Sequence, residues 1–310
     1  MHTKKLSLLD TIVLFIINTV LKVRKVSSIR AHESIVFKVR EDLEKLAAVV
    51  TKTHPQASVT RDRIDGVSAE WIKFDSLKTD RVLLYSHGGG YVIGSPASHR
   101  AMISQIAWHM KATTVVPDYR LAPEHPFPAG LDDVLAVYRH LIASGVKPEN
   151  LIIAGDSAGG GMTLALLQRL KEETMPMPAA VCCLSPWADL TQSGKSHKRN
   201  HGNDFMLSQD LLSSFATLYT NGADRNNSKI SPVFGDYFDM PPMLIQVGTD
   251  EVLLDDSRSV ATAAKLAGCD VEIQEWRSMQ HVWQYNFRFL KSARNAIRAM
   301  GTFVDTKMKL

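Results

Sequence analysis

The spacing of apolar positions changes after Pro55, and the two parts of the chain predict different elements. Residues 34–50 carry apolar side chains every three or four positions with charged residues on the opposite face, which predicts an amphipathic helix. Residues 59–64 and 69–74 alternate instead, and they predict two strands joined by a hairpin turn at Asp65-Gly66. Residues 81–86 follow as a third, mostly apolar strand.

From residue 97 onward, helical and strand patterns alternate. The predicted strands cover 113–118, 151–154, 179–184, 243–247 and 271–276. The predicted helices cover 97–110, 131–144, 157–171, 256–267 and 287–304. This repetition predicts an α/β fold with a mostly parallel sheet covered by helices on both faces. Only residues 189–227 break the rhythm, being polar and then helical around 211–219, so one domain with an insertion is the simplest organisation.

Residues 6–23 form an apolar run that Asp10 and Asn18 interrupt. A signal peptide would need a cleavage site of small residues, and none follows. A spanning helix needs about 20 largely uninterrupted apolar residues, and this run is shorter and carries an acid. We therefore favour an N-terminal helix that packs over the protein's own site, with peripheral contact to a membrane surface as the alternative.

Composition and charge exclude several classes of partner. Of 310 residues, 45% are hydrophobic and 22% charged, as in ordinary globular proteins. The net charge of +4 comes from residues 1–45, with nine Lys and Arg against five Asp and Glu, and no basic stripe with aromatics predicts a nucleic-acid partner. Cys182, Cys183 and Cys269 have neither a disulfide framework nor metal-ligand spacing. We expect no metal, buried inert thiols and a reducing, cytoplasmic setting.

Candidate chemistry begins at Gly155-Asp156-Ser157-Ala158-Gly159. This Gly-x-Ser-x-Gly pattern stands between a predicted strand and a predicted helix, which is the context of a nucleophile elbow. The two glycines leave room at the turn, so the hydroxyl of Ser157 can be exposed at its tip. The pentapeptide alone is a weak signal, and its interpretation depends on finding a base and an acid.

A serine nucleophile needs a general base that an acid orients. Both partners are expected after later strands, because the carboxyl ends of parallel strands meet at one edge of the sheet. His281 is the base in this interpretation, since no other histidine lies beyond residue 250. Asp250 is the predicted acid because it is nearest the end of its strand, ahead of Glu251, while Asp255 and Asp256 suit the start of a helix.

The tetrahedral intermediate also needs N–H donors for its oxyanion, and loss of one donor costs about 3 kcal/mol. His87-Gly88-Gly89-Gly90 follows a predicted strand, and glycines let the backbone approach a substrate oxygen. We expect the N–H groups of Gly88, Gly89 and Ala158 to form this oxyanion hole. His87 is expected to hold the loop by hydrogen bonding rather than to act in catalysis.

Taken together, these motifs resemble the hormone-sensitive-lipase-like carboxylesterases, the bacterial family IV of α/β-hydrolases. The resemblance runs from about residue 80 to the C-terminus. The segments that carry it are His87-Gly88-Gly89-Gly90-Tyr91, residues 118–129, Gly155-Asp156-Ser157-Ala158-Gly159-Gly160, Leu184-Ser185-Pro186-Trp187, and the surroundings of Asp250 and His281. Where many members have Asp-Pro-Leu, this chain has Asp250-Glu251-Val252, which is similar to the branch containing monoterpene lactone hydrolases.

The resemblance implies an eight-stranded sheet and a helical cap over the site. It implies cap segments at 1–50 and 190–228, and a catalytic core at 51–189 and 229–310. It further implies Ser157 as nucleophile, His281 as base, Asp250 as acid and His125 as structural, with a homodimer through the strand at 271–276.

The predicted function is hydrolysis of small short-acyl esters or lactones by a serine carboxylesterase without a cofactor. Amidase or acyltransferase chemistry would use the same residues, and a ligand-binding receptor on a hydrolase scaffold is a further alternative. The residues expected to line the substrate pocket are Phe15, Ile16, Tyr91, Trp187, Phe205, Met206, Leu207 and Val282.

Overall fold

The structure, a computed structural model, describes residues 36–42, 45 and 52–308. The apolar run at 6–23 and the pocket candidates Phe15 and Ile16 lie outside these residues. Residues 36–42 and Lys45 are helical, which agrees with part of the helix predicted over 34–50. No helix of the described residues is long and apolar enough to cross a membrane.

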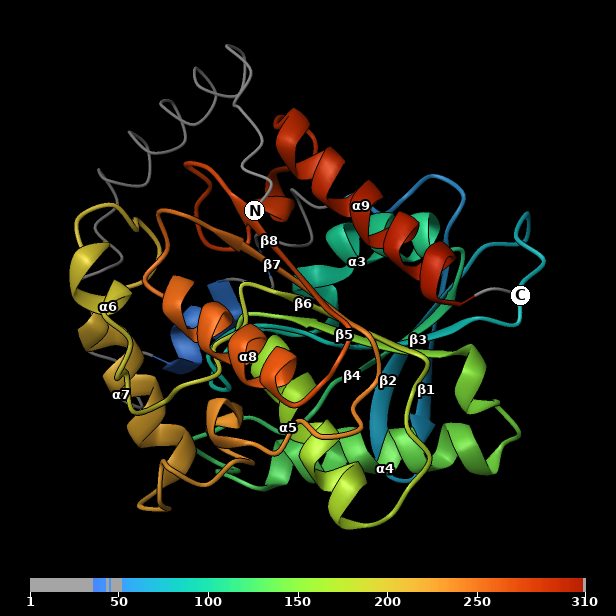
Figure 1. The fold of residues 1–310 in the computed structure, drawn as a ribbon. Helices are drawn as coiled ribbons and strands as arrows, with labels where there is room; N and C mark the ends of the chain where they lie inside the picture. Colours follow the sequence, from blue (N-terminus) through green and yellow to red (C-terminus); the bar gives the residue numbers. More distant parts are fainter. Residues whose placement is uncertain (1–35, 43–44, 46–51, 309–310) are drawn as a thin grey trace.

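An eight-stranded sheet forms the centre of the described chain (Figure 1). Its strands follow the spatial order β1-β2-β4-β3-β5-β6-β7-β8. The pairs β1–β2 and β2–β4 are antiparallel, whereas every later pair is parallel. The strands are β1 (Ser58–Ile64), β2 (Val67–Lys73), β3 (Val82–Ser86), β4 (Thr113–Pro117), β5 (Leu151–Asp156), β6 (Ala180–Leu184), β7 (Met243–Gly248) and β8 (Val271–Trp276). The predicted fold class is thus confirmed.

The hairpin between β1 and β2 turns where the sequence predicts it. Ile64 pairs with Val67, and the two residues between them, Asp65 and Gly66, have φ values of 47° and 88°. Positive φ at both positions is what a two-residue hairpin turn with the right twist requires.

Helices cover both faces of the sheet (Figure 1). On one face lie α3 (Pro96–Met110) and α9 (Lys291–Lys307), and on the other lie α4 (Ala129–Ala143), α5 (Ala158–Glu172) and α8 (Leu254–Leu266). Because both faces are covered, the inner strands β5, β6 and β7 are buried at every position and are mostly apolar. Cys182 and Cys183 lie in this core, as predicted, and burial raises the pKa of both thiols.

The last helix starts later than the sequence pattern indicates. The chain first passes through the 3-10 helix η4 (Trp283–Asn286), and α9 begins only at Lys291. Trp283 and Phe287 pack in a small apolar cluster with Leu290, so the apolar spacing here reflects packing of a bend. Two further 3-10 turns are η2 (Pro148–Asn150) and η3 (Pro232–Phe234).

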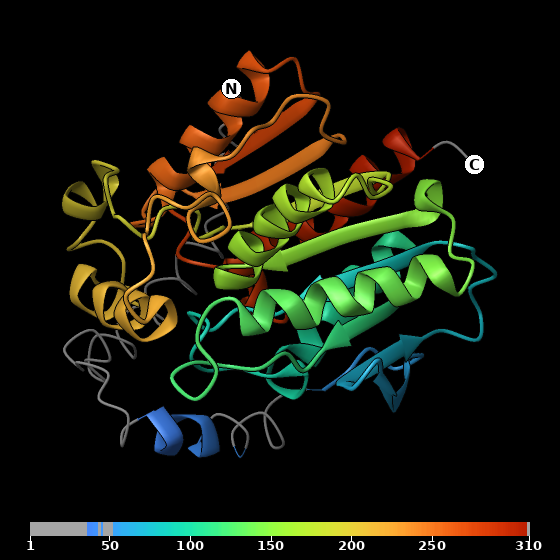
Figure 2. The ribbon, with the colours of Figure 1, turned by 90° about the horizontal axis from the view of Figure 1, so that it is seen from below.

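The insertion after β6 lies beside the carboxyl ends of the parallel strands (Figure 2). It contains α6 (Ser196–Arg199) and α7 (Gln209–Thr220), and α7 confirms the helix predicted around 211–219. The side chain of Ser208 caps the start of α7, and Asn221 ends it in the left-handed conformation. The insertion is thereby placed at the edge of the sheet that carries the candidate site.

Candidate active site

Ser157 stands at a sharp turn between β5 and α5. Its backbone has φ 54° and ψ −123°, a strained conformation for a residue with a side chain. A Cβ atom on Gly155 would lie 2.2 Å from the carbonyl oxygen of Gly159, and one on Gly159 would lie 2.0 Å from that of Ser86. Gly155 thus permits the close approach of β5 and α5, Gly159 permits that of α5 and the end of β3, and the predicted elbow is present.

His281 reaches Ser157 from the turn that follows β8. Its Nε2 lies 2.9 Å from the Oγ of Ser157, and the histidine is only 5% exposed. The predicted base therefore contacts the predicted nucleophile within hydrogen-bond distance.

The acid position differs from the prediction. Glu251, not Asp250, contacts the imidazole, with its Oε2 2.9 Å from Nδ1 of His281. Asp250 is half-buried, and its carboxylate accepts a hydrogen bond from the hydroxyl of Thr249. The prediction that Asp250 orients His281 is therefore wrong, by one residue.

Glu251 is placed by the turn after β7 and by a neighbouring strand end. Its other oxygen, Oε1, accepts the N–H of Gly248 at 2.6 Å and the hydroxyl of Ser185, just after β6, at 2.7 Å. The side chain thus folds back against the end of its own strand, which the extra methylene of glutamate permits. Proximity to the strand end favoured Asp250, but the direction of a side chain in an irregular turn depends on such contacts.

The charge environment of His281 favours the protonated imidazole. Burial alone would lower the pKa of His281, but the hydrogen bond and charge of Glu251 raise it, with further contributions from Asp204 and Asp156. The net effect is a pKa above the ordinary value of 6.5. An imidazole in this setting can accept a proton from Ser157 and hold it as an imidazolium.

The glycine loop after β3 lies against the elbow. The N–H of Gly88 donates to Oδ1 of Asp156 at 3.2 Å, so this predicted oxyanion donor is already engaged. Gly89 has φ +120°, and no hydrogen bond from the N–H of Gly89 or Ala158 is found within the described part of the chain. Two of the three predicted donors are therefore unengaged.

His87 holds the base of this loop. Its Nδ1 lies 2.8 Å from the carbonyl oxygen of Gly88, which can only accept, so Nδ1 carries the proton. Tyr119 donates its hydroxyl hydrogen to the carbonyl oxygen of His87 at 2.6 Å. Burial, aided by the charge of His99, lowers the pKa of His87 to about 3, so the ring is neutral. These contacts agree with the predicted loop-holding role.

Comparison with known proteins identifies the family. Residues 83–285 match the family described as alpha/beta hydrolase fold. An acetyl-hydrolase of Streptomyces hygroscopicus is 42% identical over 239 residues, which cover 77% of this chain and 80% of that protein. An esterase of Acinetobacter venetianus is 34% identical over 254 residues, covering 82% and 84%.

Solved structures agree. A structure of EstE5 has a TM-score of 0.91 and 36% identity, covering 96% of this chain and 99% of that chain. An esterase from the bacterial hormone-sensitive lipase family has a TM-score of 0.89 and 37% identity, covering 95% and 98%. The chain belongs to this esterase family. It is a carboxylic ester hydrolase.

The predicted pocket residues of this esterase fall into two groups. Tyr91 and Trp187 are buried, and the ring of Tyr91 stacks on Tyr219 of α7 with centroids 3.9 Å apart, so these side chains join the core to the insertion. Val282 is also buried, and its N–H donates to Ser185. By contrast, Phe205 and Leu207 are half-buried in the insertion, and Met206 is exposed.

Sequence reasoning missed Ser185 as part of the site. It stands in Leu184-Ser185-Pro186-Trp187, directly after the strand that lies between β5 and β7 in the sheet. Its position at the end of the strand next to the elbow strand is the signal that could have indicated it, although the same segment yielded only Trp187 as a predicted pocket residue.

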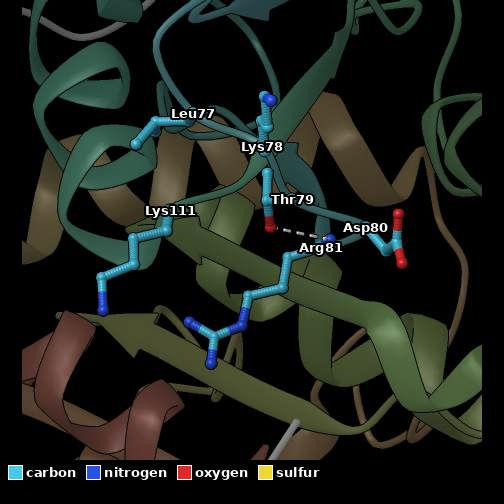
Figure 3. A pocket seen from close by; sticks show the side chains of 6 residues that line it. All are labelled: Leu77, Lys78, Thr79, Asp80, Arg81 and Lys111. Carbon is cyan, nitrogen blue, oxygen red and sulfur yellow. Dashed lines mark hydrogen bonds between the residues drawn. The ribbon is translucent and has the colours of Figure 1, made fainter.

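A separate pocket of about 590 Å³, shown in Figure 3, lies at the amino ends of β3 and β4, whereas the candidate site lies at the carboxyl ends of the parallel strands. Leu77, Lys78, Thr79, Asp80, Arg81 and Lys111 line it, and they precede β3 and β4 rather than follow them. The guanidinium of Arg81 is bound by Asp305 and by the carbonyl oxygens of Met110 and Met308. This pocket is therefore not part of the esterase site.

Proposed function

We propose that this esterase hydrolyses small short-acyl esters through Ser157, His281 and Glu251. The observation that carries the proposal is the continuous chain of contacts from Glu251 to His281 to Ser157, each 2.9 Å long, at the tip of a strained elbow. This is the arrangement in which a base and an orienting acid activate a weak hydroxyl nucleophile.

The steps follow from the geometry. Nε2 of His281 takes the proton of Ser157 as Oγ attacks the ester carbonyl carbon. The N–H groups of Gly89 and Ala158 receive the oxyanion, which the helix N-terminus of α5 also favours. The tetrahedral intermediate then collapses, and the alcohol leaves with the proton from His281. Water, deprotonated by the same imidazole, repeats the attack on the acyl-enzyme and releases the acid.

Short acyl groups are the proposed substrates because a relative at 42% identity is named an acetyl-hydrolase. A structure of EstE5 at 37% identity was soaked with p-nitrophenyl butyrate, which supports this ester as a probe. Lactones present the same carbonyl chemistry in a ring, and they belong in the same substrate panel.

The deciding experiment compares wild type with Ser157→Ala on p-nitrophenyl acetate and butyrate. We expect the variant to lose at least about a thousandfold in kcat, because removing one member of such a triad has effects of this size. A fluorophosphonate should label the wild type at Ser157 and leave the variant unlabelled. Undiminished hydrolysis by a folded Ser157→Ala protein would refute the mechanism.

A further inference from the structure

The backbone–backbone hydrogen bonds within the turn that carries Glu251 are long. The N–H of Glu251 lies 3.4 Å from the carbonyl oxygen of Gly248, and the N–H of Leu254 lies 3.4 Å from that of Glu251. Bonds of this length are near the limit of useful geometry. The carboxylate of Glu251 is held by Gly248 and Ser185, but the main chain of the turn depends on contacts from outside it.

The end of β8 and the turn after it supply some of these contacts, and side chains of the insertion supply others. The amide of Asn200 donates to the carbonyl oxygens of Thr249 at 3.0 Å and Glu251 at 2.7 Å. The hydroxyl of Ser196 donates to the carbonyl oxygen of Val252. Oδ2 of Asp204 accepts the N–H of Val252, the residue after Glu251, at 3.0 Å.

Of these three insertion residues, Asp204 binds two separate segments of the chain. Its other oxygen, Oδ1, accepts the N–H groups of Met206 at 3.0 Å and Leu207 at 2.9 Å. The residue is 4% exposed, so neither oxygen is free to water. One buried carboxylate thus binds both the turn of Glu251 and the segment 205–207, where we expect acyl-pocket residues.

The carboxylate of Asp204 also contributes to the electrostatic environment of His281. The carboxylates that raise the pKa of His281 are Glu251 from its turn, Asp204 from the insertion and Asp156 at the end of β5. Burial and the charge of Glu251 raise the pKa of Asp204, and the charge of His281 and the N–H groups of Val252 and Leu207 offset this only in part, so the net shift is upward.

We propose that Asp204, supported by Asn200, is a positioning residue that aligns Glu251 with His281 and fixes the acyl-pocket segment relative to that pair. The insertion then does more than cover the site, because part of the catalytic alignment is built from its side chains. This inference rests on the proposed roles of Ser157, His281 and Glu251.

The test variant is Asp204→Asn, which keeps the shape but retains only one accepting oxygen. An amide group then faces a backbone N–H, either that of Val252 or those of Met206 and Leu207. With rates normalised to serines titrated by a fluorophosphonate, we expect kcat to fall about 10- to 100-fold, as misplacement of catalytic groups does. The acid limb of kcat/KM should move to lower pH, and the ratio of acetate to hexanoate turnover should change.

The matched control is Asp189→Asn. Asp189, directly before the insertion, is also a buried carboxylate that accepts backbone N–H groups, but these belong to Thr191 and Ser193 in its own loop. We expect this variant to lower Tm while leaving kcat per titrated serine and the acid limb unchanged. A purely structural role of Asp204 would give the same result in Asp204→Asn and would overturn the inference.

A double-mutant cycle asks whether Asp204 acts through Glu251. In an E251Q background, D204N should cost less than about threefold more in kcat, because residues that act as a unit are not additive. Full additivity of the two losses would contradict the proposal. If D204N yields no folded protein, Asn200→Ala replaces it in the cycle, with the same expectation.

The outcomes separate the two proposals. Wild-type activity in S157A or E251Q would mean that the proposed function is wrong. Loss of activity in those variants, together with an unaltered rate and pH profile in D204N and N200A, would refute only the positioning role.

Discussion

At the scale of single residues, the site depends on which of two adjacent carboxylates faces the imidazole. Glu251 is fully buried, and both of its oxygens are engaged, by His281 on one side and by Ser185 and Gly248 on the other. Asp250 is half-buried and bonded to Thr249. Burial raises the pKa of Asp250, which the hydrogen bond from Thr249 opposes. Only Glu251 has the contacts that would hold an imidazole in one tautomer.

Matched amide substitutions test this assignment. Glu251→Gln should lower kcat about 10³- to 10⁴-fold, because an amide no longer stabilises the imidazolium or fixes the tautomer. Asp250→Asn should stay within about threefold of wild type, since it removes no contact to the base. Hydrolysis of p-nitrophenyl butyrate by both purified variants measures the difference. The reverse order of losses would restore Asp250 as the acid.

The pH dependence of kcat/KM gives an independent test of the contact between Glu251 and His281. His281 must be neutral to accept a proton, and its pKa lies above 6.5 despite its burial, because of Glu251. The acid limb of kcat/KM in the wild type should therefore lie above pH 6.5. In Glu251→Gln the carboxylate that stabilises the imidazolium is lost, so the pKa of His281 falls and the acid limb should move to lower pH. A limb that stays in place in the variant would mean that another group sets it.

At the scale of elements, the site is assembled from loops at one edge of a mostly parallel sheet. The glycine loop follows β3, the elbow follows β5, Ser185 follows β6, Glu251 follows β7 and His281 follows β8. Buried inner strands fix these ends relative to one another, and the loops supply the chemistry. The glycine loop fits against the elbow because it lacks side chains.

Gly89 and Gly66 both have positive φ, so an alanine at either position strains the backbone, but only Gly89 belongs to the proposed site. At Gly89 a Cβ would lie 2.0 Å from the carbonyl oxygen of Ile93, and the N–H is a proposed oxyanion donor. Gly89→Ala should therefore lower kcat at least about 100-fold. Gly66 has φ +88° with nothing within 4 Å of a Cβ, so Gly66→Ala should cost about 1 to 2 kcal/mol of stability and no activity. Thermal unfolding and esterase rates of both variants check this, and equal activity losses would contradict it.

At the scale of the whole molecule, segments far apart in sequence meet around the site. Arg40 joins the helical residues 36–42 to the core through Glu124 and through the carbonyl oxygens of Val92 and Ala122. Val92 lies just beyond the glycine loop, and Tyr91 beside it stacks on α7 of the insertion. We propose that the N-terminal segment and the insertion together form the cap. The homodimer through β8, which lies at the edge of the sheet, stays a prediction.

Truncation tests the cap at this scale. Deletion of residues 1–25 leaves Arg40 and its contacts in place. We expect an altered acyl-chain preference across p-nitrophenyl acetate, butyrate and hexanoate and a lactone panel, or a lower Tm, because predicted apolar cover is lost. Liposome flotation of both forms is the companion measurement. Unchanged selectivity and stability with loss of liposome binding would favour the membrane-surface interpretation.

The fold class and most elements can be predicted from the amino-acid sequence, because burial on two faces requires mostly apolar strands and burial on one face requires helices with periodic apolar positions. The sequence also predicts Ser157 and His281 as partners, because glycines flank the serine and no second histidine follows residue 250, and the structure places their side chains 2.9 Å apart.

The direction in which a side chain or a backbone N–H group points at the site follows only from the tertiary structure. Asp250 and Glu251 are adjacent in the sequence, and the hydrogen bonds from Ser185 and Gly248 hold the carboxylate of Glu251 beside His281. Likewise, the sequence offers the N–H groups of Gly88, Gly89 and Ala158 as equal candidates for the oxyanion hole. The structure distinguishes them, because the N–H of Gly88 donates to Asp156. Side-chain direction in irregular turns is set by partners distant in the chain, and no local pattern of apolar and polar residues encodes them.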